Sequence, residues 1–249
     1  MWKSILSVYV TFIYLVVYSP QTDSREIVVG LEPFPPLINE DGSGLVVDML
    51  RKFSATENIR FTFEIMTYAR AKKNLRNKKL ELIGMTPYQL ETDEFYQYAT
   101  ELDWHIDTHV HLFALDKSYF NISQLPTRSI GTLLGNAEFL AEIVGLPEKK
   151  FVEVSQLEQL VKMLALGRLK VILFEGVATM NTIKSLGLQG VYYKEMGIVP
   201  STLAIPKSAE GLILKQKLDA FLINPKNQNI FNEFIHYIPS NHVSTLLVE

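Results

Sequence analysis

The amino-acid sequence predicts an α/β fold built as two similar lobes that face each other. Short apolar runs with strand character alternate with amphipathic helical segments, and this alternation occurs twice, once before and once after residue 120. Such a pattern is typical of parallel sheets covered by helices. The 249 residues are 47% hydrophobic, which is enough to give each lobe its own core. A cleft between the lobes is the usual place for a small-molecule site.

The first lobe is expected to hold three strands and two helices before residue 90. Strands are expected at 26–31, 60–66 and 80–85, with helices at 45–58 and 68–78 between them. Thr67 is a candidate N-cap of the second helix. Loops 32–36, 66–70 and 84–88 follow the carboxyl ends of these strands, where ligands bind in such sheets. We therefore expect the three loops to converge.

The second half of the chain repeats the pattern. Strands are expected at 108–115, 129–134, 151–154, 171–174, 191–196 and 201–205, with helices after 135–136 and at 157–166 and 176–186. Ser155 and Glu158 have the spacing of a capping box for the helix at 157–166. Two amphipathic helices are expected to finish the chain, one capped by Ser208 and one beginning at Asn224-Pro225 and extending to Ile238.

This division predicts two lobes joined by two crossings. Lobe 1 is expected to comprise residues 25–115 and 206–249, and lobe 2 residues 116–205, with crossings near 113–117 and 201–207. Paired crossing strands act as a hinge about which lobes can close.

Residues 1–24 are predicted to be a signal peptide rather than part of the fold. Lys3 gives a positive start, and the apolar run 5–18 has the length of a signal-peptide core and is short for a membrane span. An uncleaved anchor is the alternative. The chain contains no cysteine, which excludes a lipid-modified cysteine and disulfides. These features predict a free protein outside the cytoplasm. The net charge of −3 is unclustered and does not favour nucleic acid as a partner.

Five segments in a fixed order resemble a known family. They are VVGLEPFPPLINEDGSGLVVDML near the start, LELIGMT, YATELDW, IGTLLGNAEF and VILFEGVAT. Their order and spacing resemble the bacterial extracellular solute-binding proteins of family 3, the polar amino-acid-binding type. This resemblance covers nearly the whole chain after the signal segment. It implies a two-lobed periplasmic-binding-protein type II fold with two hinge crossings.

The resemblance also implies which residues bind the ligand. Phe34 and Tyr68 would pack against it, Gly84, Met85 and Thr86 would offer backbone and hydroxyl groups, Asn136 and Ala137 would present a helix N-terminus to a carboxylate, and Glu175 would pair with an amine. Two alternatives stay open. Phe34 and Tyr68 have the character of ordinary core aromatics, and Glu175 stands where a helix-capping carboxylate would stand.

The sequence departs from the family at its carboxylate clamp. The family places an arginine six or seven residues before the segment that corresponds to Tyr98, where this chain has Glu91 or Thr92. No arginine lies between Arg76 and Arg128. Arg70 is the nearest substitute, and a solvated helix residue is the alternative interpretation. The ligand therefore need not be a standard α-amino acid.

The main functional prediction is a periplasmic solute-binding protein that closes on a small polar ligand, an amino acid or amine-like molecule, and delivers it to the permease of an ABC transporter. We expect a monomer that needs no cofactor. One alternative is a periplasmic sensor for a membrane signalling partner. Another is a dehydratase-like enzyme with Glu175 as general acid and Arg70 as carboxylate anchor. No G-x-S-x-G, H-E-x-x-H or phosphate-loop motif is present, so we predict no enzymatic activity.

A histidine-rich strand needs a separate interpretation. His105, Asp107, His109 and His111 would share one face of an extended strand, since side chains alternate. Imidazoles and a carboxylate can bind Zn²⁺, but a fourth ligand with clear spacing is missing. A solvated strand face explains the pattern as well, and we predict no metal site.

Overall fold

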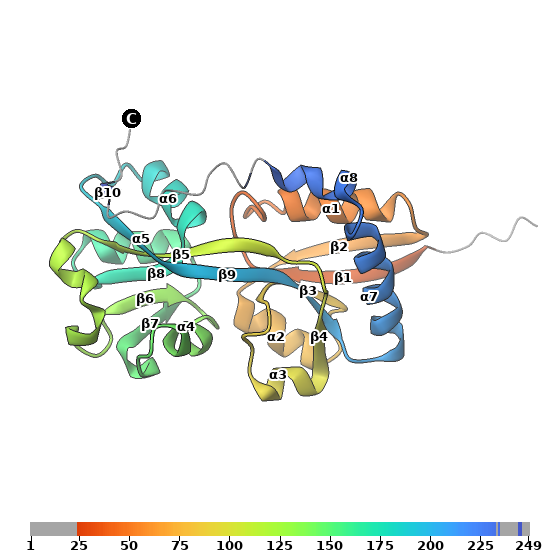
Figure 1. The fold of residues 1–249 in the computed structure, drawn as a ribbon, viewed down its shortest axis with the longest axis horizontal. Coiled ribbons are helices and arrows are strands. Elements are labelled where there is room, and N and C mark those ends of the chain that lie inside the picture. Colours follow the sequence, from red (N-terminus) through yellow and green to blue (C-terminus); the bar gives the residue numbers. More distant parts are fainter. Residues whose placement is uncertain (1–23, 233, 235–243, 246–249) are drawn as a thin grey trace, which may run out of the picture.

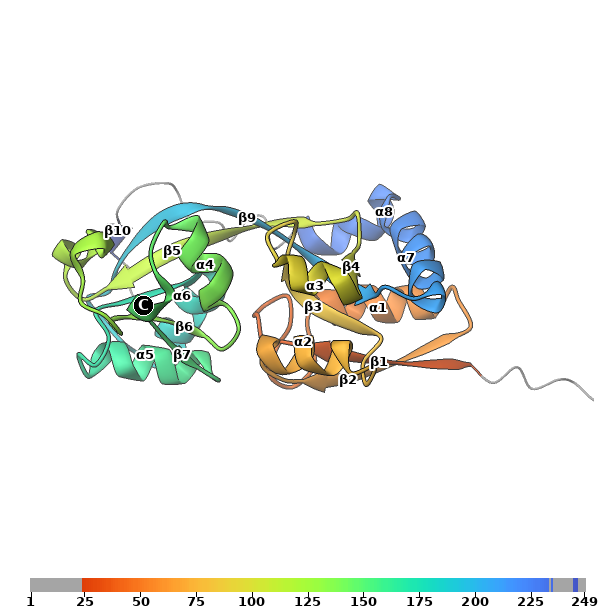
Figure 2. The same ribbon diagram turned by 90° about the horizontal axis from the view of Figure 1, so that it is seen from below.

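Two lobes lie side by side, and two long strands run through both of them (Figures 1 and 2). The structure is a computed structural model that describes residues 24–232, 234 and 244–245. The long strands are β5 (Ile106–Ala114) and β9 (Tyr192–Pro206), which pair antiparallel with each other. The predicted signal peptide lies outside the described residues except for Ser24. Among the described residues, none of the helices has the length and apolar content needed to cross a membrane.

One sheet extends across both lobes in the order β2-β1-β3-β9-β5-β8-β6-β7. The remaining main strands are β1 (Arg25–Leu31), β2 (Ile59–Ile65), β3 (Leu82–Pro87), β6 (Ile130–Leu133), β7 (Phe151–Val154) and β8 (Val171–Glu175). β1 runs parallel to β2 and β3, and β6 runs parallel to β7 and β8. β9 is antiparallel to both β3 and β5. The two predicted groups of parallel strands are therefore confirmed, and antiparallel strands join them.

Helices cover both faces of this sheet. They are α1 (Leu45–Ser54), α2 (Tyr68–Arg76), α3 (Asp93–Tyr98), α4 (Ala137–Ile143), α5 (Leu157–Ala165), α6 (Gly176–Ser185), α7 (Ala209–Leu222) and α8 (Pro225–Gln228). Short strands β4 (Ala99–Glu101) and β10 (Ser244–Thr245) pair with β9. Single 3₁₀ turns lie at Lys117–Phe120, Ile122–Gln124, Glu148–Lys150 and Asn229–Phe231. Seen from below, α2, α3 and α4 lie in front of the sheet (Figure 2).

The core divides along the two faces of the sheet because side chains alternate along each strand. Phe113 of β5 and Phe174 of β8 join a large cluster that α1, α5, α6 and α7 complete. Leu112 and Leu173, one position away, point to the other face and pack with α4. In lobe 1 a third cluster joins Ile83 of β3 to α2 and α3. Both faces are thus buried, as expected for a sheet of the α/β class.

Three predicted helix caps are confirmed and one is wrong. The side chains of Thr67, Ser208 and Asn224 each accept a backbone N–H of the first helical turn. The capping box at Ser155 and Glu158 does not form. α5 takes Gln156 as its N-cap, one residue beyond the position that the box requires.

Replacing Thr67 by alanine is expected to lower the free energy of unfolding by about 1 kcal/mol, because the first turn of α2 loses the oxygen that accepts the Arg70 N–H. Urea unfolding measures this change. Thr67→Ser keeps a hydroxyl at the same place and should retain most of the stability. Equal destabilisation by both substitutions would contradict the capping role.

Three features of the fold differ from the expectation. The predicted strands 191–196 and 201–205 form the single strand β9, because its antiparallel partner β5 continues across Gly197 and Pro200, with a bulge at Val110/His111. α3 and β4 were not predicted. The last predicted helix begins as α8 and is interrupted by a 3₁₀ turn before Asn232 and Phe234, which are again helical, and residues 235–243 lie outside the described part of the chain.

The strand pairings bear on where the chain crosses between lobes. β4 lies beside the end of β9 in lobe 1, whereas Val110–Phe113 of β5 pair with β8 in lobe 2. We therefore propose that the first crossing lies between Glu101 and Val110, earlier than the expected 113–117. We propose that the second lies near Ser201, where β9 passes from β5 to β3.

Candidate functional site

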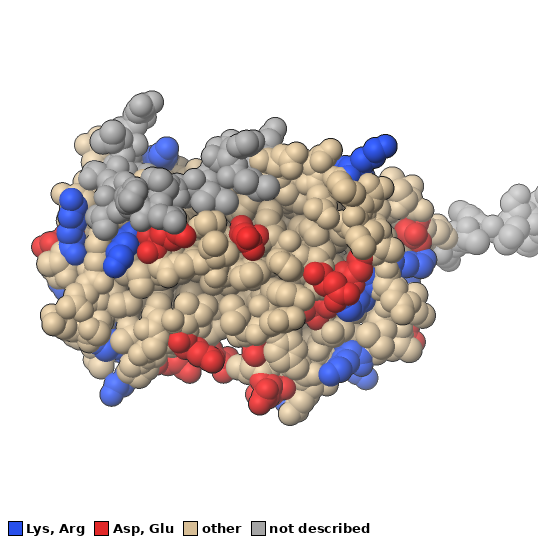
Figure 3. Space-filling view, viewed as in Figure 1, with Lys and Arg blue, Asp and Glu red and all other residues tan. Residues whose placement is uncertain are grey.

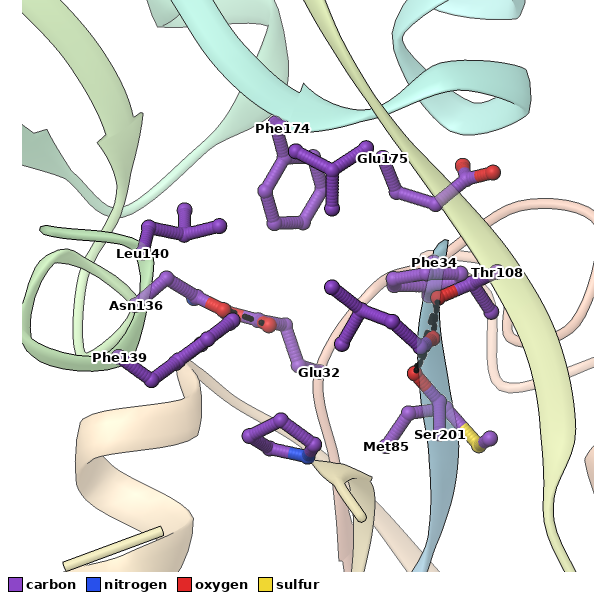
Figure 4. A pocket seen from close by; sticks show the side chains of 13 residues that line it. Glu32, Phe34, Met85, Thr108, Asn136, Phe139, Leu140, Phe174, Glu175 and Ser201 are labelled. Carbon is purple, nitrogen blue, oxygen red and sulfur yellow. Dashed lines mark hydrogen bonds between the residues drawn. The ribbon is translucent and has the colours of Figure 1, made fainter. Parts of the chain in front are cut away.

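A small cavity lies where the two lobes meet (Figure 4). Its volume is about 30 Å³, room for one or two water molecules. Its polar wall comes from Glu32, Thr108, Asn136, Glu175 and Ser201, and its apolar wall includes Phe34, Met85, Phe139 and Phe174. These residues come from the loop after β1, from β3, β5, β8 and β9, and from α4 with its preceding loop. The site is therefore assembled from both lobes at the carboxyl ends of β1 and β8, as such sheets generally arrange it.

Glu32 is the central polar residue of this cavity, and sequence reasoning missed it. It follows β1 directly and is 3% exposed. Its carboxylate accepts the backbone N–H of Tyr68 at 3.3 Å, and the side-chain amide of Asn136 donates to both oxygens at 3.3 Å (Figure 4). Since Asn136 belongs to lobe 2, these hydrogen bonds join the lobes.

Burial governs the protonation of Glu32. Loss of hydration raises the pKa of its carboxyl from 4.5 to about 7, against the opposing effects of the Asn136 amide, the Tyr68 N–H and the charge of Lys72. Lys72 lies outside the cavity wall and pairs with Glu91, with 3.1 Å between Nζ and Oε1. Within the described part of the chain, the Glu32 carboxylate thus has amide donors but no cation in contact with it.

Glu175 has a structural role in this conformation. Its two oxygens accept the backbone N–H groups of Val177 and Ala178, at 2.9 and 2.7 Å, and so cap α6. The carboxylate points away from the cavity in Figure 4. Burial raises its pKa to about 7 in spite of these donors. This geometry matches the interpretation of Glu175 as a helix cap. Both carboxylate oxygens are engaged by backbone N–H groups, so neither is oriented to bind a ligand amine as predicted.

The two phenylalanines of the apolar wall meet across the lobes. Phe34 comes from lobe 1 and Phe174 from lobe 2, with 5.8 Å between ring centroids and an edge-to-face angle of 66°. The structure places the predicted residue Phe34 in the cavity wall at 7% exposure. The two rings together occupy space that a ligand would need. A ligand larger than a few water molecules could therefore bind only if the rings moved apart.

The segment 84–88 was predicted to be a loop but belongs to β3 as far as Pro87, and it contributes to the cavity only in part. Met85 lines the cavity, whereas Gly84 and Thr86 do not. A Cβ on Gly84 would lie 2.3 Å from the side chain of Leu203, so packing against β9 explains this glycine. The Thr86 hydroxyl is buried near the Tyr68 hydroxyl, without a partner of good hydrogen-bond geometry among the described residues.

Tyr68 and Arg70 lie elsewhere than predicted. Tyr68 is fully buried in the core of lobe 1, and its hydroxyl donates to Glu91 at 2.7 Å. Arg70 is exposed on α2 and takes no part in the cavity wall. Glu91 occupies one of the two positions expected for the clamp arginine, and Tyr68 and Lys72 bind it. The other position, Thr92, caps α3.

The helix N-terminus predicted for a ligand carboxylate is already occupied. The backbone N–H groups of Gly135 and Ala137 both donate to Glu153 on β7, at 2.8 and 3.0 Å. Ala137 itself does not line the cavity. Only Asn136 of this segment reaches into it, and its amide points to Glu32.

Two hydroxyl groups from the long strands complete the polar wall. Thr108 of β5 donates to the carbonyl of Val199 at 2.6 Å, and its hydroxyl lies 3.0 Å from that of Ser201 on β9. The sequence could have predicted Glu32 as a site residue, because it is an acid directly after a buried strand. The sequence could not have predicted Thr108 and Ser201, because their hydroxyl groups come together only through the pairing of β5 with β9, two strands that are distant in sequence.

Two histidines of β5 make hydrogen-bond contacts within the sheet. His109 lies 3.0 Å from Glu195 of β9, and His111 is fully buried below Gly176, with its pKa lowered by burial. Among the residues that the structure describes, His, Asp and Glu side chains form no group of three suited to a metal ion.

The sequence matches no family model and no curated protein. Solved structures match the fold. A histidine kinase sensor domain with similarity to periplasmic binding proteins has a TM-score of 0.67 at 15% identity, with 86% of this chain and 97% of that chain covered. An amino acid ABC transporter substrate-binding protein from Streptococcus pneumoniae, bound to L-arginine, has a TM-score of 0.66 at 17% identity, covering 85% and 93%.

A further substrate-binding protein of an amino acid ABC transporter has a TM-score of 0.64 at 17% identity, covering 84% of this chain and 97% of that chain. These similarities span nearly all of each relative, and both lobes are included. The protein therefore has the two-lobed α/β fold of the periplasmic binding proteins.

Proposed function

We propose that the protein is a solute-binding protein that closes on a small polar ligand between its lobes and presents it to a membrane transporter. The observation that supports this most directly is the hydrogen bonding of Glu32 in lobe 1 to Asn136 in lobe 2 inside a buried cavity. Polar groups from two lobes that meet in one small space provide a binding site whose formation depends on closure. Substrate-binding proteins of amino acid transporters with the same fold support the assignment to transport.

The cavity volume indicates which conformation the structure represents. Ligand pockets usually measure about 300–1,000 Å³, whereas this cavity measures about 30 Å³. Phe34 and Phe174 touch, and Ala69 of lobe 1 donates its N–H to the carbonyl of Leu134 in lobe 2 at 3.2 Å. We propose that this is a closed form and that a ligand enters when the lobes rotate apart about the crossings of β5 and β9.

We propose binding rather than catalysis. In a dehydratase-like site Glu175 would donate a proton and Arg70 would anchor a carboxylate. Here Glu175 caps α6 with both oxygens, and Arg70 is exposed outside the cavity wall. The two groups needed for that chemistry do not face a common space.

A sensing function is the second candidate. The fold match to a histidine kinase sensor domain, with 97% of that domain covered, favours it. Sensing and uptake need the same closure on a ligand and differ only in the membrane partner. Permease and ATPase genes beside this gene would support uptake, and signalling genes would support sensing.

We further propose that the protein acts outside the cytoplasm as a monomer after removal of residues 1–24. The apolar run near the start and the absence of cysteine from the sequence support export without lipid attachment. Mass spectrometry of the exported protein would reveal the cleavage site.

A thermal-shift screen over amino acids, amines, small acids and sugars tests the proposed function. A ligand at one hundred times its Kd stabilises the folded protein by about 2.7 kcal/mol, which raises the melting temperature of a protein of this size by roughly 5–10 °C. We expect at least one compound to do so. A panel without any stabilising compound would contradict the proposal, and turnover of a stabilising compound would favour an enzyme.

A further inference from the structure

Among the residues that the structure describes, those lining the cavity include acidic side chains and no basic one. Glu32 and Glu175 both line the cavity, and neither lysine nor arginine is among the lining residues. The nearby basic groups have other positions, since Lys72 pairs with Glu91 and Arg70 is exposed. On the face shown in Figure 3, acidic side chains also flank the junction of the lobes at the lower middle. Where these carboxyl groups are ionised, their charge attracts cations and repels anions.

A ligand carboxylate would find no basic partner among the described residues of this wall. The N–H groups at the start of α4 donate to Glu153, and an acid, Glu91, stands at one expected position of the clamp arginine. Glu153 therefore occupies the N–H groups that a ligand carboxylate would need, and Glu91 is an acid where the family has a base. A carboxylate would therefore meet the two acids of the wall, and only the Asn136 amide and the Thr108 and Ser201 hydroxyls would be uncharged polar neighbours.

A cationic group would find a complete set of partners. Glu32 holds its carboxylate in the cavity with only long amide contacts of 3.3 Å, and hydrogen bonds to a charged donor are shorter and stronger. Phe34, Phe139 and Phe174 supply aromatic surface, which attracts ammonium and guanidinium groups through the ring quadrupole. The Thr108 and Ser201 hydroxyls add acceptors on the strand side.

We propose that the ligand is a small organic cation without a carboxylate, a primary amine, diamine or guanidine, and that Glu32 binds its charged group. This inference rests on the proposed function and narrows its substrate class. When the lobes open, the Asn136 amide leaves Glu32 and the ammonium takes its place. On closure the phenylalanine rings cover the cation and exclude water.

The raised pKa of Glu32 supports this assignment. Burial without a cation favours the protonated carboxyl. A bound ammonium group restores the charged form, so binding should release a proton near neutral pH. This release is measurable as a dependence of the binding enthalpy on the ionisation enthalpy of the buffer.

Titration calorimetry with pairs of compounds that differ only in the α-carboxylate tests the proposal. Suitable pairs are agmatine with arginine, cadaverine with lysine, and phenethylamine with phenylalanine. We expect the amine of at least one pair to bind at least tenfold more tightly than its amino acid. Glu32→Gln should weaken that binding at least tenfold, because it keeps the shape of the side chain and its hydrogen-bond acceptor but removes the charge.

The matched control is Glu40→Gln, which makes the same change on an exposed residue of the neighbouring loop and should bind like the parent. Tighter binding of an amino acid than of its amine, or equal binding by Glu32→Gln and the parent, overturns the cation assignment and leaves a solute-binding function intact. Failure of every compound in this series and in the wider thermal-shift panel overturns both proposals. A melting curve of Glu32→Gln verifies that the variant is folded.

Discussion

Replacing Gly135 by alanine is expected to hold the lobes apart. Gly135 stands in the loop before α4 with φ of +99°, and a Cβ there would lie 2.6 Å from the backbone nitrogen of Ala69 in lobe 1. The nitrogen of Ala69 is also the donor of the hydrogen bond to Leu134 that closes the lobes. The backbone of Ala69 cannot move aside as the end of a side chain can. The closed form should therefore be destabilised relative to the open form by about 2 kcal/mol, which lowers the ratio of closed to open molecules roughly thirtyfold.

Small-angle scattering measures the effect as a larger radius of gyration, and calorimetry measures it as weaker binding of any ligand found in the screen. Gly145→Ala is the matched control. Gly145 lies after the end of α4 with a positive φ of +63°, so alanine brings some backbone strain there too, but nothing lies within 4 Å of the added Cβ. If both variants scatter and bind alike, contact at Gly135 does not limit closure.

The stability of the protein is expected to fall between pH 4.5 and 7 because of Glu32. The folded form holds its proton up to a pKa of about 7, whereas an ordinary glutamate releases it near 4.5. The folded protein therefore binds more protons than the unfolded chain in this range, and the free energy of unfolding decreases as pH rises. A difference of this size corresponds to at most about 3 kcal/mol, with no further loss from this group above its folded pKa.

Urea unfolding at a series of pH values measures this effect. Glu32→Gln has no proton to lose, so its stability relative to the parent should increase with pH by up to about 3 kcal/mol between pH 4.5 and 7. Glu40→Gln should follow the parent. Parallel curves for Glu32→Gln and the parent would show that Glu32 is hydrated in solution and that the lobes are open there.

The sequence predicted the fold well where local pattern and local chemistry coincide. The first three strands, α1 and α2 appear within a few residues of their expected limits, and Thr67 caps α2 as its position suggested. β9 was divided in two because Gly197 and Pro200 resemble turn residues. Their extended conformation comes from pairing with β5, a partner that lies about ninety residues earlier in the chain.

The candidate site was predicted as a place but not as a set of side chains. The loop after β1 and the end of β3 meet there, whereas the expected loop 66–70 contributes no lining residue, and Phe34, Met85 and Asn136 line the cavity. The roles of the other residues depend on partners from distant elements. Glu153 of β7 accepts hydrogen bonds from the N–H groups at the start of α4 that were expected to bind a ligand. Glu91 accepts a hydrogen bond from the Tyr68 hydroxyl. Competition between the protein's own acidic side chains and a ligand for the same donors depends on the packing of distant elements, so the sequence alone does not reveal it.

The continuous sheet has a consequence for how the protein loses its structure. β9 carries backbone hydrogen bonds to β3 and β4 at one end and to β5 along the rest, so the two lobes share a single ladder. One lobe cannot unfold without removing the partners of a strand that the other lobe needs. The proposed rotation of the lobes about the crossings, in contrast, requires only a change in the twist of β5 and β9, and twist varies widely in two-stranded ribbons. We therefore expect the two halves to move relative to each other while the whole molecule melts cooperatively.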